Sequence, residues 1–450
     1  MTAMVRRAAA AIARTVGAAA VALCALSATP ALADGCVAPK EWFSQPVTMP
    51  DPMAFKPDAS NCDFHLWSWQ MFLWLMEPDA KTGLLRFETF PGPESLTPTA
   101  STGVTPGALL PGLKLTDSKA INEYLQAGPD GILVDQNGRI VYYSMYINDV
   151  FSGFFARNNL TSAANILALD PNTPFPPGTL SLKAAWKIVG AGDNPAGFYS
   201  RKAKINPLVK KDGKFVIDPS RTEEVTVALV GFHIAGTVAN HAEMIWASFE
   251  HNDNAPDVAN LSGVQPADVV SERNWTFYKA KTPFKDCNVN PAGSPTQTLD
   301  EATQRMSPVT QVCRLYPYGS GPDKQANADN IKSLNASVQS QDAGVWKNYF
   351  ELGSTWFNTN KSDGGGEPLQ PNCNFQPGSL RCGVVITGST HLSNSVIETF
   401  TQSQSTMDSC FSCHHTLQRF PADPSQNPLP GKDANISHIF NNLYFRLQQK

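Results

Sequence analysis

The stretch Val225-Thr226-Val227-Ala228-Leu229-Val230-Gly231-Phe232-His233-Ile234 is apolar at nearly every position. Successive side chains of an extended chain point to opposite faces, so both faces of this segment are expected to be buried. The pattern therefore predicts the central strand of a sheet. Strict alternation puts His233 on the same face as Val225, Val227 and Leu229, against the core. A hydrogen-bonded core histidine is the favoured interpretation, with a ligand or catalytic group as the alternative.

Further segments indicate that other strands surround the central one. Residues 131–147 hold Asn137-Gly138 between two apolar runs, which is a strong short-range sign of a hairpin. Residues 180–188 alternate apolar and polar side chains, and 384–386 is a last short strand. With 35 prolines, 31 glycines and only 16% charged residues, the chain favours long irregular connections over a helical bundle. We expect an α+β fold with a β-rich, loop-rich main domain.

Helical patterns are fewer. Residues 63–76 are apolar on nearly every face, so a helix here would be fully buried. Its tryptophans, Trp67, Trp69 and Trp74, favour a core helix, with the wall of a cofactor pocket as the alternative. Shorter helical patterns cover residues 118–127, 331–338 with a continuation over 345–352, 393–402 and 436–447.

The amino terminus has the order of a secretory signal. Three arginines lie within the first 14 residues, an apolar run covers 16–26, and Ala31-Leu32-Ala33 is a small-residue cleavage site. We expect cleavage after Ala33, which leaves residues 34–450 in the periplasm or secreted. No other segment reaches the length of about 20 apolar residues that a membrane span needs. Loss of the arginines changes the formal charge from −4 to −7, which favours a neutral or basic protein partner over nucleic acid.

The pattern Cys410-Phe411-Ser412-Cys413-His414 lies near the carboxyl end. Two thiols at this spacing can each add to one vinyl group of a porphyrin, and the histidine that follows can bind the iron. The pattern therefore predicts covalent attachment of one haem c, with His414 as the proximal iron ligand. A thioredoxin-like thiol pair, a zinc site and a plain disulfide are the alternatives.

Six cysteines remain when Cys24 of the signal and the pair in this pattern are set aside. In an exported protein, six thiols indicate three disulfides. Fifteen connectivities are possible, and we expect neighbours to pair in order because each pair brackets an irregular segment. The six are Cys36, Cys62, Cys287, Cys313, Cys373 and Cys382.

Only 35 residues follow His415, and none of them is methionine. A segment this short cannot enclose a haem in the manner of a small cytochrome c. We therefore divide the mature chain into a large α+β domain, 34–387, and a haem-attachment segment with a terminal helix, 388–450, which does not fold by itself. The large domain would supply any sixth ligand, and an open position is an equal alternative. The candidates for the distal ligand are His233, Met244, His251, His391 and His438.

Eight short motifs lie in a specific order along the chain, at residues 63–76, 182–186, 231–234, 245–251, 254–256, 388–390, 398–400 and 410–414. These motifs resemble those of large secreted bacterial proteins of the cytochrome c family. The resemblance extends over most of the mature chain and implies export and one haem c, without choosing a reaction. His415 departs from the small or polar residue common after the haem histidine, so the resemblance gives it no role.

These observations leave three functional hypotheses. A six-coordinate haem would make the protein an electron carrier that exchanges electrons with a redox partner protein in the periplasm. A five-coordinate haem facing a pocket would make it a peroxidase- or oxygenase-like enzyme, for which the length of 417 residues is an argument. A small-ligand sensor or a subunit of a larger complex is the third. Bacterial peroxidases with two haems are excluded because the chain has only one attachment motif.

Overall fold

The computed structural model describes residues 35–96, 123–128, 131–291, 297–319, 324–375, 382–392, 394–402 and 409–449. Residues 35–450 form one compact unit. The α+β class is confirmed. Within the described ranges, no helix is both long and apolar enough to cross a bilayer.

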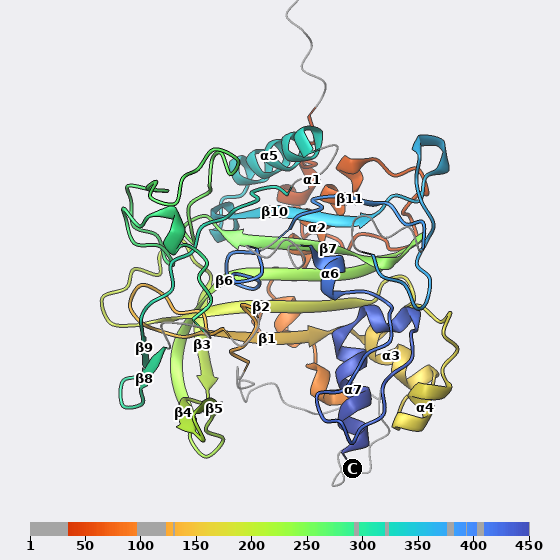
Figure 1. Ribbon diagram of the computed structural model, residues 1–450. Coiled ribbons are helices and arrows are strands. Elements are labelled where there is room, and N and C mark those ends of the chain that lie inside the picture. Colours follow the sequence, from red (N-terminus) through yellow and green to blue (C-terminus); the bar gives the residue numbers. More distant parts are fainter. Residues whose placement is uncertain are drawn as a thin grey trace, which may run out of the picture. The chain divides into compact units, whose positions relative to one another are not determined.

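One antiparallel sheet organises this unit (Figure 1). Its strand order is β1-β2-β6-β7-β10-β11, and β3 pairs with the first half of β6. The central strand expected from sequence is β6, which has β2 on one side and β7 on the other. The strands are β1 (Val141–Ile147), β2 (Leu180–Val189), β3 (Ser200–Ile205), β6 (Glu223–Val238), β7 (His241–His251), β10 (Tyr349–Phe357) and β11 (Ile386–Gly388).

Two small hairpins and short helices complete the fold. The hairpins pair β4 (Leu208–Lys211) with β5 (Lys214–Ile217), and β8 (Thr298–Asp300) with β9 (Arg305–Ser307). The α-helices besides α2 are α1 (Glu41–Ser44), α3 (Asp149–Arg157), α4 (Ala163–Ala168), α5 (Lys324–Gln341), α6 (Cys410–Cys413) and α7 (His438–Gln448). The 3-10 helices are η1 (Arg86–Thr89), η2 (Pro93–Leu96), η3 (Phe284–Asp286), η4 (Val345–Asn348), η5 (Lys361–Asp363) and η6 (Asp433–Ile436).

A bulge in β6 corrects the expected orientation of His233. Ala185 pairs with Gly231, but the next residue of β2 pairs with Leu229, so Val230 is the extra residue. An extra residue reverses the alternation of faces beyond it. Leu229 accordingly packs in the same core as Phe232, and His233 faces the opposite side of the sheet.

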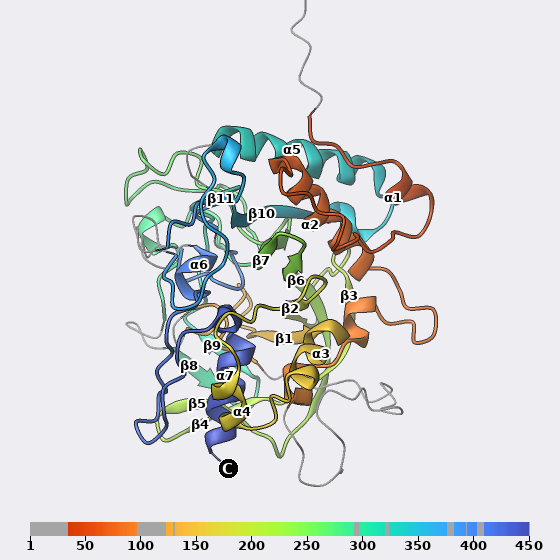
Figure 2. The ribbon, with the colours of Figure 1, turned by 90° about the vertical axis from the view of Figure 1, so that its right-hand side faces the viewer.

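Helix α2 (Asn61–Leu75) covers one face of the sheet and is the buried helix expected over 63–76. A capping box between Ser60 and Asp63 fixes its start. The ring of Phe72 stacks on Phe249 of β7 with centroids 4.3 Å apart. Trp69 is fully buried in the same core. Figure 2 shows α2 and α6 on opposite sides of the sheet, and the tryptophans of α2 pack in or against the core on the α2 side.

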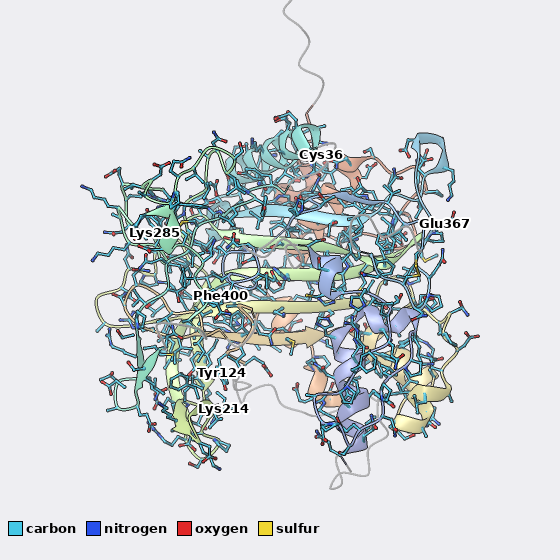
Figure 3. The ribbon with its side chains drawn as sticks, viewed as in Figure 1. Cys36, Tyr124, Lys214, Lys285, Glu367 and Phe400 are labelled. Carbon is cyan, nitrogen blue, oxygen red and sulfur yellow. A yellow bond between two sulfur atoms is a disulfide. The ribbon has the colours of Figure 1, made fainter. Side chains whose placement is uncertain are left out.

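The carboxyl-terminal segment covers the other face. Val396, Ile397 and Phe400 pack with Ala185 and Val230 in a separate apolar cluster. Figure 3 shows Phe400 over the middle of the sheet in the view of Figure 1. Phe411 lies in a further cluster with residues of α7. The haem motif therefore sits on the face toward which the bulge turns His233.

Several sequence predictions differ from the structure. Residues 345–352 form η4 and then enter β10, not a helix. Residues 394–402 form turns without a helix, and residues 123–127 are also non-helical, while 118–122 lie outside the described residues. The expected hairpin at 131–147 is present as β1 with a single bridge from Val134 to Ile140. The terminal helix, the 331–338 helix and the strand over 180–188 are confirmed as α7, α5 and β2.

The six predicted cysteines form three disulfides in the expected order. Cys36 pairs with Cys62 and fastens the amino-terminal segment to α2. The other bonds close short loops and join Cys287 to Cys313 and Cys373 to Cys382. Disulfides of this number fit a protein that folds in an oxidising compartment.

Candidate haem c site

Cys410 and Cys413 begin and end the single turn of α6. They are the two cysteines with free thiols in the described part of the chain. Burial, together with the nearby Glu398 carboxylate, raises the pKa of both thiols. A thioredoxin-like pair needs a lowered thiol pKa, so these surroundings count against that alternative. The described residues also bring no three His, Cys, Asp or Glu side chains together around a metal position, which gives the zinc alternative no support.

His414 has the hydrogen bonding of an imidazole ready to bind a metal through Nε2. Its Nδ1 donates to the carbonyl oxygen of Ile436 over 2.8 Å, and a carbonyl only accepts, so the proton is on Nδ1. Burial and the neighbouring His438 lower the pKa of His414 well below its usual value, which keeps the ring neutral. A neutral ring with its proton on Nδ1 presents a bare lone pair at Nε2.

Two rings enclose the His414 imidazole. Trp246 of β7 approaches one side, with centroids 3.9 Å apart and planes 34° apart. His438, the first residue of α7, stacks at 4.0 Å and 21°. His438 also donates from Nε2 to the carbonyl of Cys413 over 3.1 Å. Three separate elements therefore fix the orientation of the imidazole.

Arg419 holds the chain that leaves α6. Its Nη2 donates to the carbonyl oxygens of Cys413 and His415, over 2.8 and 2.9 Å. Its Nη1 lies 3.2 Å from Nε2 of His415. The His415 ring thus faces Arg419. Thr416 then donates to the Gln370 carbonyl over 2.6 Å and accepts from the Cys373 amide over 2.9 Å, which ties this turn to the start of the loop closed by the Cys373–Cys382 disulfide.

A small hollow beside Cys410 is lined by His233, Glu398, Trp246, Ser248 and Leu392, among others. Its volume of about 20 Å³ is room for a single water. His233 Nε2 lies 3.4 Å from Glu398 Oε2 and has no hydrogen bond. Burial, reinforced by the Lys183 charge, lowers the pKa of His233 to about 3, so the ring is neutral. Burial raises the pKa of Glu398 to about 7, against the opposite pull of Lys183.

Lys183 completes this group. It pairs directly with His233 across β2 and β6, and its Nζ donates to Gln126 Oε1 over 2.7 Å. Burial lowers the pKa of Lys183, while the Glu398 charge opposes the change. The hollow beside Cys410 is therefore lined by an unprotonated imidazole and a carboxyl group that titrates near neutrality, and the charge of Lys183 acts on both.

The other four predicted distal candidates are placed differently. His251 donates from Nε2 to the Gly197 carbonyl, accepts from the amide of Asp253 at Nδ1, and so has both nitrogens engaged. His391 stacks on Tyr316 and is not part of the hollow. His438 stacks face to face on His414, whereas trans ligands of one iron point at each other. Met244 is buried in the apolar cluster that contains Phe411.

The site also uses residues that sequence reasoning did not assign. Trp246 and Glu398 lie within the motifs 245–251 and 398–400, but those motifs carried no role. Lys183 likewise lies within the motif 182–186 without a role, and Arg419 gave no signal, because its part depends on contacts that the sequence does not show. No protein-family model, curated protein or solved structure matches the chain.

Proposed function

We propose that this protein is an exported c-type cytochrome with one haem, bound through thioether links to Cys410 and Cys413 and through iron to His414. The observation that carries the proposal is the hydrogen bond from His414 Nδ1 to the Ile436 carbonyl, which leaves the lone pair of Nε2 free to bind a metal. His414 directly follows Cys413, and the thiols of Cys410 and Cys413 form no disulfide. The three side chains have the donor types and spacing that haem c needs. The hollow beside Cys410 is much smaller than a porphyrin, so the side chains that line it would have to move apart to admit the haem.

We assign the sixth position to His233. Its ring is neutral, its Nε2 has no hydrogen bond, and it lines the same hollow as Cys410. Its place in the central strand, paired on both sides, gives it a rigid support. The haem supplies a one-electron couple when bound, and two imidazole ligands suit electron transfer because neither has to leave. The function that follows is electron exchange with a redox partner protein in the periplasm.

One observation favours the alternative, a haem-dependent oxidoreductase with an open distal position. Glu398 stands beside His233 with a pKa of about 7, so its carboxyl group can hold or release a proton at neutral pH. Lys183 brings a positive charge to the same place. Together with the unprotonated imidazole of His233, this carboxyl group could hold or release a proton beside the haem, which would supply the redox chemistry when bound.

The three disulfides support export, because disulfides persist in oxidising compartments. The first 33 residues, which have the order of a secretory signal, support it as well. Cleavage after Ala33 remains part of the proposal. Its check is the amino-terminal sequence of the protein recovered from a periplasmic fraction.

The test of the haem proposal is a denaturing gel stained for haem peroxidase activity, together with the mass of the intact chain. Absence of both the stain and the added mass of one haem would refute it. The test of the distal assignment is the visible spectrum with and without carbon monoxide. We expect a low-spin spectrum that the gas leaves unchanged, and a high-spin, gas-binding spectrum for His233→Gln. His391→Gln is the matched control and should behave as the native protein. Rapid binding of the gas by native protein would favour the alternative.

A further inference from the structure

A second, larger pocket lies apart from the haem site. It has a volume of about 260 Å³ and opens between the residues that follow β7, the start of β10, helix α5 and the segment 314–318. This is close to the lower end of the volumes found for small-molecule sites. The pocket shares no lining residue with the hollow beside Cys410. Any role for it is therefore independent of the proposed haem chemistry.

The charged groups in and behind this pocket are of both signs. The Arg314 side chain is 5% exposed and donates to Glu250 over 2.9 Å and to Asp257 over 2.5 Å. Glu250 is fully buried behind the pocket, whereas the Asp257 side chain is 42% exposed. Lys332, on the exposed side of α5, is the second cation of the lining. Two positive and two negative groups cancel, so the pocket is unsuited to a strongly charged ligand.

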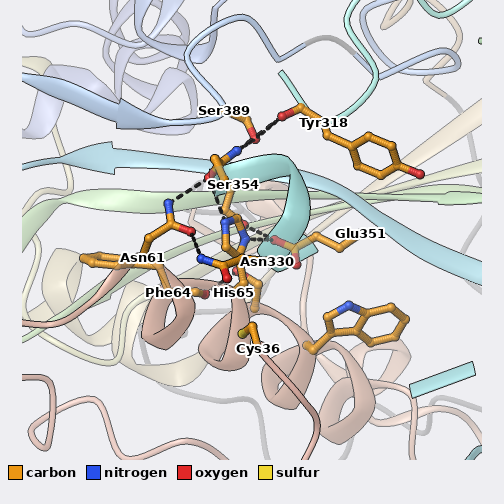
Figure 4. A network of polar contacts seen from close by, with 12 residues as sticks. Cys36, Asn61, Phe64, His65, Tyr318, Asn330, Glu351, Ser354 and Ser389 are labelled. Carbon is orange, nitrogen blue, oxygen red and sulfur yellow. Dashed lines mark hydrogen bonds and ion pairs between the residues drawn. The ribbon is translucent and has the colours of Figure 1, made fainter. Parts of the chain in front are cut away.

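Aromatic rings form part of the wall. The Arg314 guanidinium lies over the ring of Phe350, 5.1 Å from its centroid, and Lys332 lies 5.2 Å from the centroid of Tyr318. Tyr318 has a φ of +66°, which is rare for a bulky side chain. Asn327 and Ser389 hold this peptide by donating to the Tyr318 carbonyl over 3.2 and 3.1 Å. Figure 4 shows the Tyr318 ring pointing away from these polar contacts. Backbone held in such a conformation by buried partners is characteristic of functional sites.

Polar groups without a partner complete the lining. Gln339 uses its amide nitrogen to bond the Tyr349 carbonyl, and its Oε1 accepts no hydrogen bond within the described residues. The exposed Asn252 side chain makes none there either. Balanced charge, amide and carboxylate groups and an aromatic face together match a ligand with many hydroxyl groups and apolar C–H faces. We propose that this pocket binds an uncharged sugar of one or two rings.

Isothermal titration calorimetry on the full-length haem-containing protein tests this proposal, with glucose, galactose, maltose and cellobiose as probes. We expect at least one sugar to bind. Ala336→Trp should abolish the binding, because Ala336 lines the pocket from an exposed position on α5 and a large ring there fills the space. Ala326→Trp is the matched control, since it lies exposed on the same helix outside the pocket and should bind as the native protein does.

A second variant tests the aromatic wall. Tyr318→Asn removes the ring, and asparagine tolerates the positive φ, so the fold should persist. We expect the dissociation constant to rise about tenfold, the upper size of an aromatic contact. No binding of any of the four sugars, or equal binding by native protein and Ala336→Trp, would overturn the proposal. The haem stain is unaffected by any of these outcomes, so failure here is distinguishable from failure of the proposed function.

Discussion

Replacing Glu351 by glutamine should destabilise the protein strongly, because Glu351 is the counter-charge of a buried histidine. His65 and Glu351 are fully buried, and His65 Nδ1 lies 2.8 Å from Glu351 Oε1 (Figure 4). Asn327 accepts from the other ring nitrogen over 2.9 Å, so both nitrogens donate and the ring is an imidazolium. Burial lowers the pKa of His65, but the charge and hydrogen bond of Glu351 outweigh it and raise that pKa above 6.5.

The expected cost is about 3–5 kcal/mol, the range for removing one partner of a buried ion pair. The sign of the pH dependence follows from the raised pKa of His65. Its contribution to stability is fully present below pH 6.5, the unfolded value, and is lost as the pH rises through the higher folded value. Native stability should therefore fall above pH 6.5, whereas Glu351→Gln should lack this dependence.

The assay is urea unfolding followed by tryptophan fluorescence between pH 5 and 9, since the chain has nine tryptophans. His65→Gln combined with Glu351→Gln is the control, because two neutral groups can hydrogen-bond without a buried charge. This double variant should be more stable than Glu351→Gln alone. A loss below 1 kcal/mol for Glu351→Gln, or an unchanged pH dependence, would refute an ionised pair.

Three further predictions address other parts of the molecule. Replacing both Cys410 and Cys413 by serine should remove the haem stain from a denaturing gel, whereas His415→Gln should keep it. Asp433→Asn should stabilise the protein by about 1–2 kcal/mol at pH 8, a value that allows for solvent screening. Burial, and after it the Asp170 charge, raises the pKa of Asp433 to about 6, so the ionised carboxylate destabilises the folded state at pH 8. That gain should vanish below pH 4, as urea unfolding at both pH values will show. Gly231→Ala should cost about 1–3 kcal/mol in the same assay, since a Cβ there would lie 2.4 Å from Val396 Cγ2.

Each of these has an outcome that contradicts it. A stain that survives in the double serine variant would place the covalent link elsewhere. An Asp433→Asn variant that is less stable at pH 8 would mean that the carboxylate has a favourable partner. Gly192→Ala is the control for Gly231, because no atom lies within 4 Å of the added Cβ, although its φ of +89° carries its own strain. Equal stability of Gly231→Ala and the native protein would mean that the segment with Val396 does not pack on β6.

Some features of the fold follow directly from the local sequence pattern. The apolar run at 225–234 predicted the central strand β6, the apolar residues at 63–76 predicted the buried helix α2, and the irregular segments between neighbouring cysteines predicted the order of the disulfides. The prediction for 345–352 failed because all nine residues of β10 are buried, so the strand shows no alternation. Residues 394–402 form turns in place of the expected helix, and Asn394 and Ser395 bond to β7 in addition to their own turn. The face of His233 depends on a bulge at Val230 that alternation alone cannot reveal.

Residues of one strand, β7, connect the sheet to the segment that carries Cys410, Cys413 and His414. On β7, Trp246, Ser248 and Glu250 point to the same face at a spacing of two residues. Trp246 lies against the His414 ring, and Ser248 accepts from the Asn394 side chain over 2.9 Å.

Glu250 accepts from the Ser395 amide over 2.5 Å and binds Arg314 on its other side. These anchors lie outside residues 388–450, whereas the contacts of the His414 ring with Ile436 and His438 lie within the segment. A fragment restricted to 388–450 should therefore acquire haem but lack the Trp246 contact with the His414 ring, and its spectrum should differ from that of the whole protein. Identical spectra would mean that the sheet contributes nothing to the iron site.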